Sequence, residues 1–358
     1  MKRNILLLFT FFACITVQGQ TPVRLVDLRS EHLDRPIGLD NPVPRLSWRM
    51  EDGRQGAVQT SWRIVVDEDS LNVVNGCGRM WDSGKNDSRN QLVAYAGKKL
   101  QPFTRYYWKV ICSDMEYKET ASPVSYFETG MMGMQHWQGA WIGDGKDIHY
   151  GPAPYFRKEF KTGKKVKSAR AYIAAAGLYE LYINGEKIGD HCLAPLYTRF
   201  DRRNLYVAYD VTSQLQNGDN AIGVLLGNGW YNHQSKAVWD FDRAPWRNRP
   251  TFCLDLRITY TDGSVETIPT DLSWRTASGA ITFNSSAASD VYKRQGEHYD
   301  ARLEQKGWST PEFDDSKWRG VAYRSVPSSN VTAQQVHPIR NVKIFPAVSF
   351  RKVDEKTY

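Results

Sequence analysis

The sequence predicts an all-β protein, and three observations support this fold class. Apolar and polar residues alternate with a period of two in many short runs, which is typical of half-buried strands. Pairs such as Asn184-Gly185 and Asp262-Gly263 follow such runs, and these pairs favour tight hairpin turns. After the signal-like N-terminus, the i, i+3, i+4, i+7 spacing of an amphipathic helix is hard to find. Many short strands joined by such turns indicate β-sandwiches.

The composition is that of a folded chain with several domains. The 358 residues are 41% hydrophobic, 13% aromatic and 24% charged, which excludes wholesale disorder and allows two or three domains. The formal net charge of +8 is spread along the chain without a basic block, so we expect no nucleic-acid partner. The one long apolar run lies at the extreme N-terminus, and we expect no transmembrane span.

Residues 1–20 have the layout of a secretory signal peptide. Lys2 and Arg3 precede an apolar core, and small residues predict cleavage after Gly19. A buried N-terminal helix is one alternative. The sequence that ends at Cys14 also loosely resembles a lipoprotein cleavage box, which makes lipidation of that residue another. We therefore expect an exported protein that is periplasmic, attached to the cell surface or secreted.

Four cysteines remain after the predicted cleavage, namely Cys77, Cys112, Cys192 and Cys253. Export permits disulfides, but these residues are widely and irregularly spaced, and no CxxC or Cys/His cluster suggests zinc. Cys112 alternates in phase with the apolar residues of a predicted strand. The pattern therefore predicts free, mostly buried thiols rather than a disulfide framework.

Residues 22–131 hold about seven strand-like runs, which is the size of one fibronectin- or immunoglobulin-like sandwich. In the run from 105 to 112, alternate residues are apolar or aromatic and include Trp108 and Cys112. Trp48 lies in a similar run, so we expect both tryptophans in the core. The glycine- and methionine-rich segment 130–135 is interpreted as a linker.

Residues 137–325 are enough for a larger, jelly-roll-type sandwich. One strand is predicted from the inward-facing set Tyr179, Leu181 and Ile183, which alternates with Glu180 and Tyr182. A second strand places four apolar residues from 254 to 260 on one face, and the run that holds Trp274 is predicted to place that residue in the core as well.

The last segment, 327–358, is predicted to begin a further β domain. It starts new strands at 342–345 and 348–350, and these have no partner in the remaining sequence. An incomplete sheet buries too little apolar surface to be stable alone. We therefore interpret this segment as the truncated start of the next domain.

Motifs in both sandwiches resemble a known family. The first sandwich carries the motifs 36–40 (PIGLD), 44–48 (PRLSW), 81–85 (WDSGK), 105–108 (RYYW) and 127–130 (FETG). The second carries the motifs 175–179 (AAGLY), 183–190 (INGEKIGD), 209–212 (YDVT), 226–231 (LGNGWY), 270–274 (TDLSW), 296–302 (GEHYDAR) and 313–318 (FDDSKW). In this order and spacing they closely resemble the N-terminal half of bacterial α-L-rhamnosidases, a family of inverting glycoside hydrolases. The likeness extends from about residue 22 to the end of the chain.

The resemblance implies that hydrolysis belongs to a part that this chain lacks. In the family an (α/α)6 barrel follows the β-sandwiches and supplies paired carboxylates, which inverting enzymes hold roughly 6.5–9.5 Å apart. We therefore expect no catalytic residue in this chain, no required cofactor, and the missing barrel as a partner. Glu297 and Asp300 lie close together in a family motif, but we interpret them as structural.

The resemblance also implies a sugar site in the second sandwich, where some family members bind rhamnose with calcium. Their Asp-Asn pair corresponds here to Asp190-His191. Asp190 retains a carboxylate that suits calcium, whereas His191 lacks the amide oxygen that asparagine would supply. A possible structural calcium at Asp190 and contact with rhamnose-containing glycans are therefore hypotheses.

A long loop from 228 to 250, called the aromatic loop below, is predicted to complete this site. It combines Trp230 and Trp239 with Asp240 and Asp242. Aromatic faces beside carboxylates suit a sugar, which presents apolar C–H patches and hydroxyls together. Loops of this length in compact domains are usually functional or disordered. Packing of these rings against the barrel of the whole enzyme is the alternative.

The segment 285–295 (SSAASDVYKRQ) interrupts the family pattern. It is identical to one in-frame translation of a widely used transposon-based sequencing adapter. We interpret it as an assembly artefact and assign it no function. A genuine polar surface loop is the alternative, and resequencing the locus from source DNA distinguishes the two.

These features predict the accessory N-terminal part of an exported α-L-rhamnosidase. Two other functions remain open at this point. The first is a stand-alone secreted carbohydrate-binding protein that never had a barrel. The second is a set of accessory domains from a glycosidase with another sugar specificity.

Overall fold

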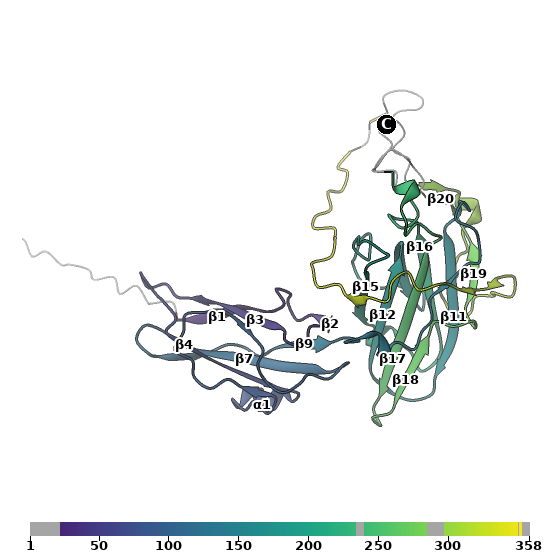
Figure 1. The fold of residues 1–358 in the computed structure, drawn as a ribbon. Coiled ribbons are helices and arrows are strands. Elements are labelled where there is room, and N and C mark those ends of the chain that lie inside the picture. Colours follow the sequence, from purple (N-terminus) through teal and green to yellow (C-terminus); the bar gives the residue numbers. More distant parts are fainter. Residues whose placement is uncertain (1–21, 234–239, 285–296, 350, 353–358) are drawn as a thin grey trace, which may run out of the picture. The chain divides into compact units, whose positions relative to one another are not determined.

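The computed structural model describes residues 22–233, 240–284, 297–349 and 351–352. The predicted signal peptide with Cys14, Trp239 of the aromatic loop, and the segment 285–295 lie outside these residues. Within the described ranges strands predominate, and α1 (Ser70–Val74) is the single α-helix, which confirms the all-β fold class (Figure 1). The chain divides into two compact units.

The first unit comprises the residues up to Arg29, Leu46–Gly97 and Tyr107–Ser125. Its elements are β1 (Arg24–Ser30), β3 (Arg45–Glu51), β4 (Ser61–Asp67), α1 (Ser70–Val74), β5 (Trp81–Asp82), β6 (Leu92–Ala94), β7 (Arg105–Ser113) and β8 (Glu119–Ala121). Strands β1, β3 and β6 form one sheet, while β4 pairs with β5 and β7, and β7 pairs with β8.

The core of this unit confirms the predicted alternation. Trp108 and Cys112 on β7 are buried, as is Trp48 on β3, because alternate strand residues point to the same face of a sheet. Trp48 meets the edge of the Trp62 ring at a centroid distance of 6.2 Å, and its Nε1 donates to Gln59 over 2.9 Å. The indole N–H of this buried tryptophan is therefore satisfied.

The second unit comprises Ser30–Arg45, Lys98–Tyr106 and the chain from Tyr126 onward. Its first elements are β2 (Ile37–Leu39), β9 (Ser125–Thr129), η1 (Met134–His136), β10 (Ile142–Gly143), β11 (Pro154–Thr162), β12 (Val166–Ala176), β13 (Leu178–Ile183), β14 (Glu186–Lys187), β15 (Asn204–Asp210), η2 (Thr212–Gln214) and β16 (Gly218–Gly227). The remaining elements are η3 (Phe241–Arg243), β17 (Thr251–Tyr260), β18 (Val265–Pro269), β19 (Arg275–Ser278), β20 (Ile281–Asn284), β21 (Glu297–Tyr299), η5 (Ala301–Leu303), β22 (Arg319–Gly320), β23 (Ala322–Tyr323) and β24 (Val331–Ala333).

Two large sheets of the second unit enclose its main core (Figure 1). One has the order β23-β10-β17-β12-β15-β24 with β18 on β17, and the other has the order β14-β13-β16-β11-β19-β22. Tyr179, Leu181 and Ile183 of β13 point into this core, as their alternation predicts, and Trp274 is fully buried there. Strands β20 and β21 form a separate pair.

The turn between β13 and β14 shows why the sequence folds back at this point. Asn184 and Gly185 have φ angles of 50° and 87°, the left-handed conformations that a two-residue hairpin turn requires. The Asn184 amide also donates to Asn220 Oδ1 over 2.8 Å, which ties the turn to β16. The predicted Asn-Gly hairpin is therefore present.

Two parts of the chain differ from the sequence-based expectation. In the expected linker, Met131 is buried in an apolar cluster of the second unit, and residues 134–136 form η1. At the other end, β24 lies beyond the expected boundary at 325, yet it pairs in parallel with β15. The segment 327–358 therefore contributes a strand to the second unit's sheet, and residues 342–345 are not in a strand.

The four cysteines of the described residues are free thiols, as predicted, but only Cys112 and Cys253 are buried, whereas Cys77 is exposed and Cys192 is half-buried. Burial raises the pKa of the Cys112 thiol to about 12, so this group is inert at neutral pH. None of the helices in the described part of the chain combines the length and apolar character that a membrane crossing needs.

Candidate functional site

An aromatic cluster gathers around the described part of the aromatic loop. Its members are Tyr197, Phe200, Trp230, Tyr231, His233, Phe241 and Trp246. The Trp230 ring stacks on His233 with centroids 5.5 Å apart and an interplanar angle of 10°. Phe241 meets both Trp230 and Trp246 edge to face, and Trp246 Nε1 donates to the Trp230 carbonyl over 3.3 Å. The rings are thus partly buried against one another, whereas Tyr197 is 46% exposed.

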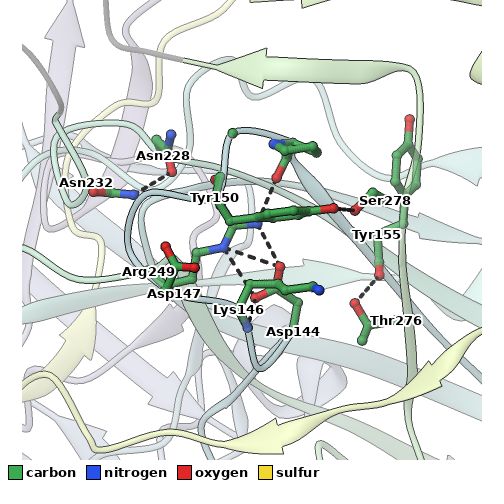
Figure 2. Close-up of polar contacts among 12 residues, drawn as sticks. Asp144, Lys146, Asp147, Tyr150, Tyr155, Asn228, Asn232, Arg249, Thr276 and Ser278 are labelled. Atoms are coloured by element: carbon green, nitrogen blue, oxygen red, sulfur yellow. Dashed lines mark hydrogen bonds and ion pairs between the residues drawn. The ribbon is translucent and has the colours of Figure 1, made fainter.

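The C-terminal end of the loop is fixed by a buried arginine. Arg249 is 1% exposed and its Nη2 donates to Asp144 Oδ2 over 2.7 Å. Its remaining donors reach the carbonyls of Tyr150 and Pro152, each over 2.7 Å, and Figure 2 shows Arg249 beside Asp144 and Tyr150. A buried ion pair with its other donors satisfied holds a single geometry.

Two buried asparagines fix the N-terminal end of the loop (Figure 2). The Asn228 backbone N–H donates to Asn284 Oδ1 over 2.6 Å. Asn232 Nδ2 donates to Asn228 Oδ1 over 3.1 Å and to the Ile148 carbonyl over 2.9 Å. Arg247 Nε donates to Asn232 Oδ1 over 3.1 Å, which links the two ends of the loop. Hydrogen bonds at both ends of the loop therefore hold the segment that carries the aromatic cluster.

Both predicted acidic residues of the loop lie near the cluster's Phe241. Asp240 is exposed, has a φ of 52° and precedes η3. Asp242 is half-buried, and its Oδ1 has no hydrogen-bond partner among the described residues. Because this Oδ1 atom is buried, the exposed Asp240 carboxylate is the better placed of the two to accept from a ligand hydroxyl.

The other predicted pair, Asp190-His191, is hydrogen-bonded to side chains outside the aromatic loop. Arg340 Nε donates to Asp190 Oδ1 over 2.7 Å, and this hydrogen bond holds the pKa of Asp190 below its usual value. His191 Nδ1 lies 3.2 Å from the Tyr209 hydroxyl. Burial lowers the pKa of His191, with the positive charge of Arg340 as a second cause, so its imidazole is neutral at pH 7.

The structure does not place all predicted residues in one pocket. His191 and Arg340 line a pocket of about 390 Å³, whose lining includes neither Trp230 nor Asp240 nor Asp242. The loop residues are instead gathered around the aromatic cluster. The described part of the chain therefore presents two separate groups of candidates.

Comparison with known proteins gives the family. Residues 164–343 match the family model described as the alpha-L-rhamnosidase N-terminal domain, and residues 25–133 match the Rha78A-like, N-terminal immunoglobulin domain. The chain belongs to the α-L-rhamnosidase N-terminal domain family. The sequence-based recognition of this family is thereby confirmed.

Individual family members agree with this assignment. An alpha-L-rhamnosidase of Formosa agariphila is 32% identical over 95% of this chain and 38% of its own length. The structure of an alpha-L-rhamnosidase from Dictyoglumus thermophilum matches with a TM-score of 0.80 and 37% identity, over 89% of this chain and 36% of that one. An Aspergillus terreus enzyme matches with a TM-score of 0.80 and 28% identity, over 90% and 36% of the two chains. The chain spans between 35% and 48% of the length of the curated relatives that it matches.

The resemblance suggests a calcium ion at Asp190, but the described residues around Asp190 do not fit one. Calcium takes six to eight oxygen ligands, whereas the Asp190 carboxylate is occupied by the Arg340 guanidinium and His191 presents nitrogen. Among the described residues, no group of three or more histidine, cysteine or acidic side chains is arranged to hold a metal ion.

Of the two acidic residues interpreted as structural, Asp300 has a structural role as a cap. Asp300 caps η5 by accepting from the Arg302 backbone N–H over 3.0 Å, and its side chain pairs with the Arg302 guanidinium over 2.6 Å. These hydrogen bonds from Arg302 lower the pKa of Asp300, which is the opposite of what a general acid needs. Glu297 is exposed on β21.

Sequence reasoning missed two residues that shape these sites. Tyr197 lies outside the aromatic loop, yet its ring contacts Trp230 and stacks on Phe241. Arg340 reaches Asp190 across 150 residues of sequence. Neither contact has a local signal, because both join segments that only the folded chain brings together.

Proposed function

We propose that this chain is the accessory, glycan-contacting part of an exported α-L-rhamnosidase, which releases terminal α-L-rhamnose from glycans. The family assignment and the names of the relatives support this function. The chain alone is inactive, and the catalytic barrel of the same polypeptide is its partner. The capping role of Asp300 and its pairing with Arg302 support the absence of catalysis here.

The observation that carries the glycan contact is the aromatic cluster with its adjacent carboxylates. Trp230 and Tyr197 present aromatic surface, and the exposed Asp240 and half-buried Asp242 place carboxylates beside it. A sugar stacks its C–H face on such rings and donates its hydroxyls to such oxygens. The anchored loop ends reduce the entropy lost on binding.

Calorimetric titration of the full chain with L-rhamnose tests this contact. We expect weak saturable binding that falls at least tenfold in Trp230→Ala and in Asp240→Asn. Trp81→Ala, which truncates a half-buried tryptophan of the first unit, is the matched control and should bind as the parent does. Binding that is absent, or unchanged in both loop variants, contradicts the proposal.

The same titration with calcium or with a chelator separates the two sugar-site hypotheses. Because Arg340 occupies Asp190, we expect equal affinity in both buffers and in Asp190→Ala. A calcium-dependent affinity that Asp190→Ala abolishes would instead support the metal site. A parallel assay with p-nitrophenyl α-L-rhamnoside should detect no hydrolysis by this chain.

A second role for the aromatic loop is docking of the catalytic barrel. Trp230, Phe241 and Trp246 are each half-buried and pack against one another, and half-buried aromatic rings of this kind favour a protein partner as well. In the whole enzyme, Tyr197→Ala would then lower the thermal midpoint without changing rhamnose affinity. The calorimetric result for Trp230→Ala distinguishes this role from glycan contact.

Export is tested at the N-terminus. We expect the mature protein, recovered from the periplasm or medium, to begin at Gln20. Lipidation at Cys14 would instead give a membrane-associated protein that incorporates labelled palmitate. A cytoplasmic protein with an intact N-terminus would contradict both forms of export.

A further inference from the structure

A pocket of about 620 Å³ lies on the β13-β16-β11 sheet, on the face opposite the main core. Because Tyr179, Leu181 and Ile183 point inward, the alternating residues Glu180 and Tyr182 point to this other face. The lining further includes Tyr155, Leu225, Glu297, Tyr299, Glu304 and Trp308. We call this site the sheet pocket; its lining includes none of the residues predicted for the sugar site.

Aromatic rings form one wall of the sheet pocket. The Trp308 ring meets Tyr155 at a centroid distance of 4.8 Å and Tyr182 at 5.1 Å, both edge to face. Trp318 stacks on Trp308 with an interplanar angle of 19°. Packing from three sides fixes the orientation of the Trp308 ring, which remains half-buried and lines the pocket.

Two glycines provide the space for these rings. A Cβ at Gly223 of β16 would lie 2.5 Å from Cζ3 of Trp308, so only glycine lets this indole rest on the strand. A Cβ at Gly279 would likewise overlap the Tyr155 ring. The sheet is therefore shaped to hold Trp308 and Tyr155 against its surface.

The segment that carries Trp308 is fixed to the sheet by a buried cation. Arg157 of β11 is fully buried and donates to the carbonyls of Trp308 and Thr310, each over 2.9 Å. The Gly185 backbone N–H donates to the Ser309 carbonyl over 3.0 Å. These contacts hold the wall in place before any ligand arrives, which lowers the cost of binding.

Carboxylates and phenols surround the aromatic wall. The Tyr182 hydroxyl donates to Glu180 over 2.6 Å, and the Tyr299 hydroxyl donates to Glu304 over 2.6 Å. The pKa of Tyr155 is raised by burial first and then by the negative charges of Glu297, Glu304 and Glu180, which line the same pocket. The pocket thus combines ring faces with oriented hydrogen-bond acceptors.

We propose that the sheet pocket is a second carbohydrate site, specific for a neutral saccharide with vicinal hydroxyls. Its volume lies within the roughly 300–1,000 Å³ typical of ligand sites. Trp308 offers a surface for the C–H face of a sugar ring, and Glu297 and Glu304 accept from its hydroxyls, whereas Glu180 is already held by Lys187 and Tyr182. Glu180 forms an ion pair with Lys187 and Lys306 also lines the pocket, so the remaining negative charge of Glu297 and Glu304 disfavours a uronate or sulfated sugar through like-charge repulsion. This inference does not depend on the aromatic loop or on the rhamnosidase assignment.

Ligand-observed saturation-transfer NMR on the full chain tests this site. The probes are D-galactose and D-galacturonate, which share their stereochemistry and differ in charge. We expect transfer to D-galactose and at least tenfold less to D-galacturonate. Choline is a third probe, because an aromatic wall with carboxylates also suits a quaternary ammonium, and a preference for choline would overturn the proposal.

Exposed variants locate the binding and avoid unfolding. Tyr299→Ala and Glu304→Gln should reduce transfer to D-galactose at least fivefold. Tyr117→Ala and Glu312→Gln, which alter exposed residues outside the pocket lining, are the matched controls and should have no effect. Trp230→Ala should also leave the D-galactose signal unchanged. Loss of signal in Trp230→Ala, or no loss in either pocket variant, overturns the assignment to the sheet pocket.

Discussion

The aromatic loop and the sheet pocket both collect aromatic rings beside carboxylates, but they support those rings differently. In the loop, Trp230, Phe241 and Trp246 pack on one another, and Arg249 and Asn228 fix only the ends of the segment. In the pocket, Trp308 rests on a glycine of a strand. The loop rings therefore depend on one another for support, whereas Trp308 is supported by the strand beneath it.

Removal of the loop's buried cation should have the largest effect. Arg249→Met leaves the Asp144 carboxylate buried without its partner, and we expect a loss of about 3–5 kcal/mol in the free energy of unfolding. Urea titration measures this loss. Arg243→Met, an exposed change in the same loop, should stay within about 0.5 kcal/mol. A loss below about 1 kcal/mol for Arg249→Met would show that the loop is not held by this ion pair.

Asp255 on β17, in the other large sheet of the second unit, is buried and should make the free energy of unfolding depend on pH. Burial raises the pKa of Asp255 to about 6, although the Gln138 and Gly139 N–H groups donate to it. The folded state therefore binds this proton more tightly than the unfolded state. Its contribution is present below about pH 4 and is lost as the pH rises through about 6, by roughly 3 kcal/mol.

Asp255→Asn isolates this contribution. The free energy of unfolding of the parent chain, relative to that of the variant, should fall between pH 4 and pH 7. Urea titrations at several pH values measure this difference. The altered hydrogen bonds of the variant add a constant amount to it, which cancels because only its change with pH is compared. Parallel curves for the two proteins would mean that Asp255 titrates normally.

Gly223→Ala tests the support beneath the sheet pocket. The added Cβ displaces the Trp308 ring, so we expect a loss of about 1–3 kcal/mol in stability and loss of D-galactose binding. Gly320→Ala is the matched control, because a Cβ there meets no atom within 4 Å. If Gly223→Ala keeps its D-galactose signal, the fixed position of Trp308 is unimportant for the site.

Tyr197→Ala should have the smallest effect on stability, and it tests whether the aromatic loop binds sugar independently of the sheet pocket. The ring is 46% exposed, and its truncation should change the free energy of unfolding by less than about 1 kcal/mol. L-Rhamnose affinity should fall a few-fold, while D-galactose binding in the sheet pocket stays constant. Calorimetry and NMR on the same preparation measure both, and equal losses at the two sites would contradict their independence.

Much of the fold could be predicted because its signals are local. The inward set Tyr179, Leu181 and Ile183, the Asn184-Gly185 turn and the free Cys112 are each encoded within a few residues. The boundary at 325 could not be predicted from local patterns. Strand β24 joins β15 in parallel, and parallel pairing links residues that are far apart in the sequence.

The candidate sites divide in the same way. Composition and family motifs identified Trp230, Asp240 and Asp242, because aromatic and acidic residues are concentrated in one segment. They did not identify the sheet pocket, whose lining comes from β11, β13, β16, β21 and the segment around Trp308. Each of these segments resembles an ordinary strand or turn when it is considered alone.

The sequence by itself determined the all-β class, the family and the residue types available for sugar contact, because periodicity, turn pairs and motifs are properties of short segments. Only the tertiary structure decided which of those side chains are already held by hydrogen bonds, ion pairs or packing from other parts of the chain. Arg340 takes the Asp190 carboxylate from 150 positions away, while Gly223 and Arg157 hold Trp308 on the sheet. The physical reason is that burial, charge pairing and ring support depend on contacts between distant segments, which form only when the chain folds.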